Sequence, residues 1–363
     1  MRILITGGSG FIAWYFHRDL AQFGHERVSF DLIDPPADQP EGAPFIRGDV
    51  RDPAAVRRAL ANGIDTVVHL AAAHHDFGIE HDTYYDVNER GAEVLCDAMD
   101  EAGVKRCVFY STVATYGDAP PPHEETSPTA PNSPYGGSKL KGEGVFERWT
   151  ERGDDRRALI IRPTVTFGAH NFANMYSLIR QIHSGKYLRF GAGTNIKSLS
   201  YVENIVDATL FLSGLKPDQR PTRELAPFEV VNYIDKPDYT STQISDRVSA
   251  ALGKKPAPAV PYGVGMLAGL PFDAVIKLTG KNLPISTARI AKLFKHETKF
   301  EADKLRDLGY TPKVPLGEGI DKMVEWYLRT GKNEDATWHQ PPAETVIVNP
   351  EGDPSPAGQP QPA

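Results

Sequence analysis

Short apolar runs alternate with amphipathic helical segments through the first half of this chain. Segments such as 53–61 and 88–102 repeat their apolar positions every three or four residues. Between them lie strand-like runs at residues 2–6, 28–34, 45–47, 66–70, 106–111 and 158–162. This alternation predicts an α/β fold with a Rossmann-like, doubly wound parallel sheet. Ligands of such sheets bind beyond the carboxyl ends of the strands.

The alternation ends after residue 168. The second half indicates a helix at 171–185, a hairpin or loop at 187–200, a helix at 201–212, a strand at 229–234 and mainly helical chain at 238–338. We therefore expect a first domain at 1–168, to which 201–235 returns, and a smaller, mainly helical C-terminal lobe at 169–340. Residues 341–363 are rich in Pro, Gly and Gln and have little to bury, which predicts a disordered tail.

Composition excludes several classes of protein. The chain has 363 residues and a formal net charge of -7, and it lacks the basic stripe that a nucleic-acid partner requires. Its only cysteines, Cys96 and Cys107, stand in apolar surroundings, so we expect no disulfide framework and no metal site. The first strand begins at Arg2, which leaves no room for a signal peptide and predicts a cytoplasmic protein.

A glycine-rich turn follows the first strand. Gly7, Gly8 and Gly10 end the apolar run and open a helical pattern, an arrangement that lets backbone N–H groups approach a pyrophosphate. The next strand ends in Asp31 and Asp34, and a carboxylate there binds a ribose 2′-hydroxyl. These features predict a domain that binds NAD rather than NADP. Asp31 is our first choice as the residue that binds the ribose, and Asp34 is the alternative.

Three further residues form a set that moves protons on and off alcohols. Thr112 supplies a hydroxyl, and Tyr135 and Lys139, four residues apart, share a face if they lie on one helix. The lysine charge would lower the pKa of the phenol, which makes Tyr135 a candidate base. A Tyr-x-x-x-Lys alone is more often a surface pattern, and it gains weight here because it follows a dinucleotide-binding turn.

These motifs together resemble the extended short-chain dehydrogenase/reductase family of nucleotide-sugar epimerases and dehydratases. In order they are 7–10, 48–50, 69–72, Asn88, Thr112 with 116–117, 135–139 and 162–163. The resemblance implies that Thr112 binds the reacting hydroxyl, that Tyr135 is the acid and base, and that Lys139 holds the nicotinamide ribose. It also implies a set of NAD-binding residues, namely Gly7, Gly10, Phe11, Ile12, Asp31, Asp34, Asp49, Val50, Leu70, Ala71, Ala72, Asn88, Ser111, Tyr135, Lys139, Pro163 and Val165.

The second half is similar to a narrower bacterial group. Segments 84–88, 162–168, 174–182, 191–198, 232–238, 261–269 and 278–281 resemble epimerases of N-acetylhexosaminyl-diphospho-undecaprenol in O-antigen assembly. Ala13 replaces the third glycine of the family loop. His170 and Phe172 stand where arginines are expected beside Asn171, which reduces the charge that faces a substrate diphosphate.

The resemblance implies an NAD-dependent 4-epimerase of a diphosphate-linked N-acetylhexosamine, acting through a transient 4-keto sugar in surface polysaccharide synthesis. Dehydratases of the family carry Asp-Glu after the threonine, and Val113 and Ala114 stand there instead, which argues against dehydration. A UDP-sugar 4-epimerase, an NAD-dependent sugar or steroid dehydrogenase, and a non-catalytic NAD sensor remain alternatives.

The sugar and its carrier, UDP or polyprenyl diphosphate, stay open. Candidate substrate-binding residues are Thr112, Asn171, Asn174, Lys197 and Arg289, each weighed against an ordinary surface or packing role. A homodimer is a further hypothesis.

Residues 260–278 are apolar apart from Asp273 and Lys277. The segment is too short and too interrupted to span a bilayer. Two interpretations follow: a buried helical cap of the second lobe, or a segment that lies in the membrane interface and places the enzyme at the inner face of the membrane.

Overall fold

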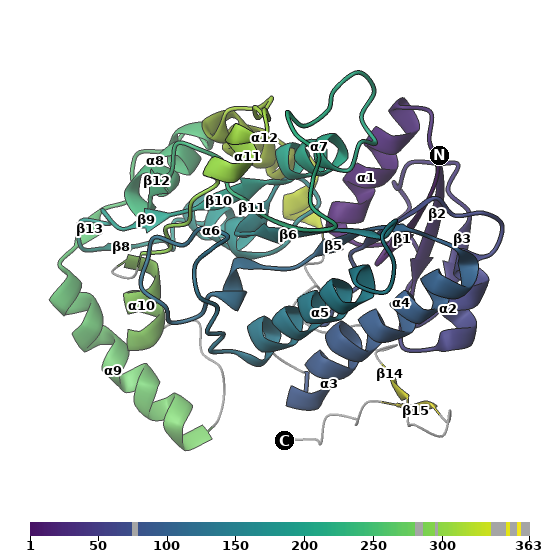
Figure 1. The fold of residues 1–363 in the computed structure, drawn as a ribbon. Coiled ribbons are helices and arrows are strands. Elements are labelled where there is room, and N and C mark those ends of the chain that lie inside the picture. The colour runs from purple at the N-terminus through teal and green to yellow at the C-terminus, as the bar shows by residue number, and fades with distance from the viewer. Residues whose placement is uncertain (75–78, 280–285, 295–296, 335–345, 349–353, 357–363) are drawn as a thin grey trace.

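A seven-stranded parallel sheet forms the centre of the molecule (Figure 1). The computed structural model describes residues 1–74, 79–279, 286–294, 297–334, 346–348 and 354–356. The strands are β1 (Arg2–Thr6), β2 (Glu26–Asp31), β3 (Phe45–Arg47), β4 (Thr66–His69), β5 (Arg106–Tyr110), β6 (Arg157–Pro163) and β11 (Phe228–Tyr233), in the order β11-β6-β5-β4-β1-β2-β3. The chain winds outward from β1 in both directions, which confirms the doubly wound α/β prediction.

Two cores form because successive residues of each strand point to opposite faces of the sheet. Ile3 and Ile5 share one core with α1 (Phe11–Gln22) and α7 (Val202–Leu212). Leu4 lies in the other core, which is closed by three helices, α2 (Pro53–Leu60), α4 (Gly91–Ala102) and α5 (Pro134–Thr150). Helices therefore cover both faces and leave the strand ends open.

The second half supplies helices and short strands beyond the sheet. Helices α6 (Asn174–His183), α8 (Ser241–Ala251) and α12 (Leu316–Arg329) pack together, and α11 (Asp303–Asp307) lies against β11. Strand β7 (Val165–Phe167) pairs with β10 (Leu199–Tyr201). Helix α7 packs in the core of the central sheet, and strand β11 pairs with β6. The domain limits, with the return of 201–235 to the first domain, stay predictions.

Local differences from the sequence analysis arise at two places. The hairpin considered for 187–200 does not form, because β8 (Arg189–Phe190) pairs with β13 (Ala259–Val260) and β9 (Ile196–Lys197) pairs with β12 (Tyr239–Thr240). Before α4, the chain forms α3 (His81–Tyr85) and then a π-helical turn at Asp86–Arg90. Such turns are rare and often mark functional sites.

Helix α9 (Tyr262–Thr279) is not the buried cap considered for residues 260–278. It extends from the body of the molecule with α10 (Thr287–Phe294) beside it (Figure 1), and Leu267 and Leu278 are 69% and 85% exposed. Pairing with α10 covers only one side of the helix. Among the helices that the structure describes, none is both long enough and apolar enough to cross a membrane.

The C-terminal segment contains two short strands. Strand β14 (Val346–Val348) pairs with β15 (Pro354–Pro356). The other residues of 341–363 lie outside the part that the structure describes, so the expected disordered tail stays a prediction.

Candidate active site

The glycine turn brings three chain segments close together beyond β1. Gly7 has a φ of +68°, and a Cβ atom there would lie 2.6 Å from the backbone nitrogen of Ala71. Helix α1 begins after Gly10 without a side-chain cap, so its first N–H groups stay available for an anion. Ala13 is fully buried in α1, where an alanine fits. Phe11 and Ile12 are half-buried beside this turn, as are Leu70, Ala71 and Ala72 after β4.

The two candidate ribose carboxylates lie in different environments. Asp31 ends β2 and accepts hydrogen bonds from the backbone N–H groups of Ser9 (2.9 Å) and Ile33 (3.3 Å). Burial raises the pKa of Asp31, against the lowering effect of these N–H groups. Asp34 is 75% exposed and pairs with Arg47 at 2.5 Å. The geometry favours Asp31 as the ribose ligand, because it is fixed beside the glycine turn.

A buried arginine organises the next part of the cofactor edge. Arg51 donates from Nε and Nη2 to the Asp49 carboxylate (3.0 and 2.6 Å) and from Nη1 to Asp86 (3.0 Å). Its side chain is 1% exposed. Val50, also buried, lies against Gly91 at the start of α4. Arg51 was not predicted from the sequence, where its only signal is its position two residues after Asp49.

Asn88 links the loop after β4 to α5. It lies in the π-helical turn and is fully buried. Its Oδ1 accepts from Ala73 N and its Nδ2 donates to Ala73 O and to Ser138 Oγ, at 3.0, 3.0 and 2.9 Å. Ser138 Oγ in turn donates to Tyr135 O at 2.9 Å. One amide side chain therefore sets the position of the helix turn that carries Tyr135.

Helix α5 packs closely against the turn that follows β5. Thr112 caps the 3₁₀ turn Val113–Thr115 by accepting from Ala114 N at 3.1 Å. A Cβ atom at Gly136 would lie 2.5 Å from Ala114 O, so only glycine permits this approach. Tyr135 precedes Gly136 in the first turn of α5 and is half-buried. The fold thus brings the turn that bears Tyr135 against the segment that starts at Thr112.

Lys139 lies one turn after Tyr135 and is 1% exposed. Its Nζ is 4.1 Å from the centre of the Phe109 ring. Burial lowers the pKa of Lys139 to about 7, although the nearby Glu143 charge raises it. A cation held in a dry environment acts strongly on charges that form near it. The expected lowering of the Tyr135 pKa by Lys139 stays a prediction.

Glu143 and Arg162 form a buried ion pair behind Lys139. Arg162 Nε and Nη2 donate to the two Glu143 oxygens at 2.9 and 2.5 Å, and Ser111 Oγ donates to Glu143 Oε1. Arg162 also lies over the Tyr116 ring, 4.9 Å from its centre. The pair ties α5 to β5 and β6, and the sequence analysis did not assign it. Its signal is the spacing of four residues between Lys139 and Glu143.

The predicted substrate-binding residues are spread over several elements. Asn171 Oδ1 accepts from Ala173 N at 2.7 Å just before α6, and Asn174 is exposed at the first position of that helix. Lys197 is half-buried on β9. Arg289 belongs to α10, but its side chain lies outside the described part of the structure. Of the two remaining NAD-binding candidates, Pro163 is buried at the end of β6 and Val165 is 41% exposed on β7.

His170 and Phe172 pack among aromatic rings. His170 stacks on Trp14 with ring centres 4.7 Å apart, and its Nδ1 is 3.2 Å from the Asp38 carboxylate. Burial lowers the pKa of His170, although Asp38 raises it. Phe172 contacts the Trp326 ring edge-on. His170 therefore contacts the loop after β2, and Phe172 contacts α12. Both side chains lie at the rim of the site.

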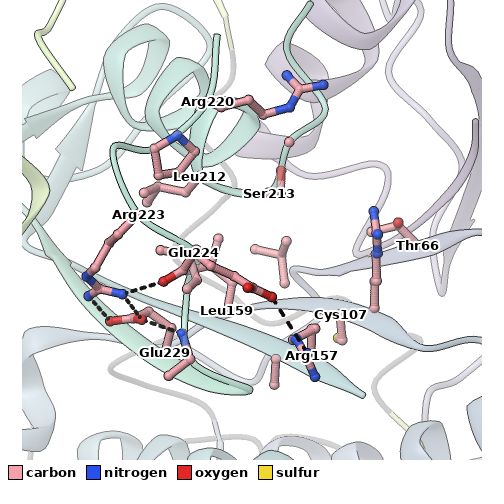
Figure 2. Close-up of a pocket in the computed structure, with 17 residues that line it drawn as sticks. Thr66, Cys107, Arg157, Leu159, Leu212, Ser213, Arg220, Arg223, Glu224 and Glu229 are labelled. Atoms are coloured by element: carbon pink, nitrogen blue, oxygen red, sulfur yellow. Dashed lines mark hydrogen bonds and ion pairs between the residues drawn. The ribbon is translucent and has the colours of Figure 1, made fainter. Parts of the chain in front are cut away.

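A hollow of about 350 Å³ opens at the opposite, amino edge of the sheet (Figure 2). Thr66 and Arg157 begin β4 and β6 there, and Arg223 donates to both oxygens of Glu229 at 2.9 and 3.0 Å. Burial would raise the pKa of Glu229, but hydrogen bonds from Arg223 and Lys304 outweigh it and lower the pKa to about 2. The predicted cofactor and catalytic residues all lie away from this hollow, at the carboxyl edge.

Residues 3–221 match the model of the NAD dependent epimerase/dehydratase family. The chain is 40% identical over 293 residues to N-acetyl-α-D-glucosaminyl-diphospho-ditrans,octacis-undecaprenol 4-epimerase of Escherichia coli O157:H7, covering 80% of this chain and 86% of that one. It is 26% identical to mouse dTDP-D-glucose 4,6-dehydratase, covering 92% and 90% of the two chains.

Solved structures give the same fold. UDP-glucuronic acid 4-epimerase from Bacillus cereus, in complex with NAD, superposes with a TM-score of 0.69 at 21% identity and covers 91% of this chain and 99% of that one. The start of α1, which has no side-chain cap, and the Asp31 carboxylate beside it are polar groups that would fit the pyrophosphate and the ribose of a dinucleotide. The family match and the close relative together show that this chain belongs to the NAD dependent epimerase/dehydratase family, with NAD as its cofactor.

Proposed function

We propose that this protein is a 4-epimerase of an N-acetylhexosamine joined through a diphosphate to a polyprenol. One observation carries the proposal. The elements that bear Thr112, Tyr135 and Lys139 meet at the carboxyl edge, in a chain 40% identical over most of its length to an enzyme named for that reaction. Surface polysaccharide synthesis is the process that such a substrate serves.

The residues at this edge perform the proton transfers. Tyr135, as phenolate, takes the proton of the C4 hydroxyl while Thr112 holds that hydroxyl by a hydrogen bond. The Lys139 charge favours the phenolate over the phenol. Bound NAD supplies the hydride acceptor and donor for C4. The 4-keto sugar then rotates in the site so that its opposite face receives the hydride. Tyr135 returns the proton, and C4 is inverted without net redox change.

The residues that follow Thr112 support inversion over dehydration. A 4,6-dehydratase requires an additional acid and base for the C5 and C6 atoms, and in the family this pair follows the threonine. Val113 and Ala114 occupy those positions here, in the short turn that Thr112 caps. Neither side chain has a group that can donate or accept a proton. Overall likeness to a dehydratase is therefore outweighed by the residues at the reacting atoms.

The substrate diphosphate is assigned to the start of α6 and its surroundings. Asn174 lies at the first position of α6, where free N–H groups and the helix dipole favour an anion. Asn171 precedes it, and Lys197 and Arg289 are the cations proposed for the phosphates. We further propose that the enzyme works at the cytoplasmic face of the membrane and forms a homodimer.

Product analysis of the purified enzyme tests the substrate. UDP-GlcNAc and polyprenyl-diphospho-GlcNAc are incubated in parallel, and the sugars are released and separated. We expect the galacto product from the lipid-linked sugar at a much higher rate. Turnover of UDP-GlcNAc alone would establish the nucleotide-sugar alternative. NADH that accumulates in step with product would indicate a dehydrogenase, and no turnover with either substrate would favour the NAD sensor.

A further inference from the structure

Helix α9 carries most of the exposed large apolar side chains of the described structure. Six of nine such residues lie on it, namely Val264, Leu267, Leu270, Phe272, Val275 and Leu278. With 3.6 residues per turn, Val264, Leu267, Val275 and Leu278 fall on one side of the helix. This stripe, which we call the open face of α9, runs from the first turn to the last. Single exposed apolar residues need no explanation, but a continuous stripe does.

The other side of α9 attaches the helix to the protein. Gly265 lies against the Phe190 ring, and Gly269 lies against the backbone of Thr287. The Asp273 carboxylate accepts from Thr287 N at 3.0 Å and from Thr287 Oγ1 at 2.5 Å. The only acid of α9 is therefore turned toward α10. The open face keeps its exposure because the packing side is already occupied.

Charge separates this part of the chain from the rest. Residues 252–296 contain seven basic residues (Lys254, Lys255, Lys277, Lys281, Arg289, Lys292 and Lys295) and one acid, Asp273. Their net charge is +6, whereas the whole chain carries -7, so the remainder carries -13. An apolar helix inside a basic segment of an otherwise acidic protein is typical of regions that lie on anionic bilayers.

We propose that the open face of α9 docks into the boundary between the headgroups and the acyl chains of an anionic bilayer. Lys255 and Lys277 then contact lipid phosphates while Leu267 and Leu278 enter the acyl region. This inference rests on the proposed substrate, because a polyprenyl chain stays in the bilayer and its sugar diphosphate must be reached from the surface.

The charge pattern selects a bilayer over a second copy of this chain. Two copies that joined through their open faces would bring two +6 segments together, with no acidic group on either face to offset the repulsion. Anionic headgroups neutralise the same cations and release counterions. The area beside the stripe is also apolar: Pro261, Met266 and Thr287 line a hollow of about 540 Å³ together with Val264, Leu267 and Leu270.

Vesicle sedimentation tests the proposal on the full chain without substrate. One set of vesicles contains phosphatidylethanolamine with phosphatidylglycerol, and the other contains phosphatidylcholine alone. We expect the protein to sediment with the anionic set. Leu267→Gln with Leu278→Gln should lower the partition coefficient by about tenfold or more, because two leucines no longer enter the acyl boundary. Lys255→Gln with Lys277→Gln should lower it about tenfold, on the anionic set only.

A matched control changes two lysines elsewhere. Lys322 lies on α12, which packs against α6 and α8, and Lys332 lies in the turn that follows α12. Their replacement by glutamine removes the same charge from exposed sites and should leave sedimentation unchanged. Circular dichroism and turnover of a water-soluble sugar diphosphate should match the wild type for all three variants, since none of the six residues touches the site.

Two outcomes would overturn the inference. The wild type could stay in the supernatant with both vesicle sets, or the leucine variant could show a smaller oligomer than the wild type by light scattering without lipid, which would make the open face a self-interface. Vesicle binding without activity on the lipid-linked sugar would refute the proposed function and leave the docking intact. Activity on that sugar without vesicle binding would refute the docking and leave the proposed function intact.

Discussion

Buried ionisable side chains have different surroundings at the two edges of the central sheet. At the amino edge, Glu229 is bonded to Arg223 and ion-paired with Lys304 at 2.5 Å, so its charge is fully matched. At the carboxyl edge, Lys139 is buried against the Phe109 ring, and His69 Nε2 is buried with no hydrogen-bond partner among the described residues. Burial, with the charge of Lys139, lowers the pKa of His69 to about 3.

This difference shows where the fold accepts an electrostatic cost. A buried cation with few polar partners destabilises the folded chain. Among the residues that line the hollow at the amino edge, every arginine is exposed or half-buried. The cost is useful only where a negative charge is to form, as on Tyr135. Glu143 and Arg162 separate the two regions, because their opposite charges offset each other directly behind Lys139.

The largest effect is expected from Glu143→Gln. The change keeps the shape of the side chain but leaves the buried Arg162 charge unpaired, which should lower the free energy of unfolding by about 3 kcal/mol or more. Urea denaturation measures it. Glu229→Gln is the control at the amino edge and should cost less, because the Arg223 and Lys304 side chains that it leaves unpaired are 51% and 29% exposed. Equal losses would show that the two edges do not differ.

Tyr135→Phe addresses the chemistry of the carboxyl edge alone. It removes the proposed base and should lower kcat by roughly 100-fold or more while stability and NAD binding persist. Initial rates with the lipid-linked sugar and a titration with NAD measure the two effects. Tyr327→Phe on α12 is the control. It removes a phenol that contacts His183 and should leave kcat unchanged. A near-normal rate in the Tyr135 variant would refute its assignment as the base.

Asp31→Asn probes the cofactor part of the same edge. Loss of the carboxylate should weaken NAD binding by about tenfold and narrow the preference over NADP, because a charged hydrogen bond to the ribose is lost. Asp34→Asn should have little effect, since Asp34 is exposed and paired with Arg47. Calorimetric titration with both dinucleotides compares them. The reverse order of effects would assign the ribose to Asp34.

The smallest effect is a gain of stability in Lys139→Met without cofactor. Below pH 7 the folded state carries a buried charge that the unfolded state exposes to water. The pKa of Lys139 is about 7 in the folded state and about 10.4 in the unfolded state. This cost disappears as the pH rises from the first value to the second. The variant should therefore be more stable than the wild type at pH 7. The difference should shrink toward pH 10 in thermal melts, and a gap independent of pH would mean that Lys139 is well solvated.

Local signals in the sequence predicted the sheet and the first residues of the site. Glycines at a strand end and a Tyr-Lys spacing of four residues depend only on nearby chain, and the structure brings the elements that carry them together. The contacts of Arg51 with Asp86 and of Glu143 with Arg162 were not predicted, because they join segments 35 and 19 residues apart. The exposure of α9 was also undecided, since an apolar helix has the same sequence pattern whether protein or lipid covers it.

Retention of a C4 deuterium tests most directly that the carboxyl edge inverts C4 without net redox change. Polyprenyl-diphospho-GlcNAc labelled at C4 is incubated with the enzyme in ordinary water, and the released sugars are analysed by mass spectrometry and NMR. The account predicts a galacto product that keeps the deuterium at C4, with no accumulation of NADH. Loss of the label to water, or NADH formed in proportion to product, would contradict it.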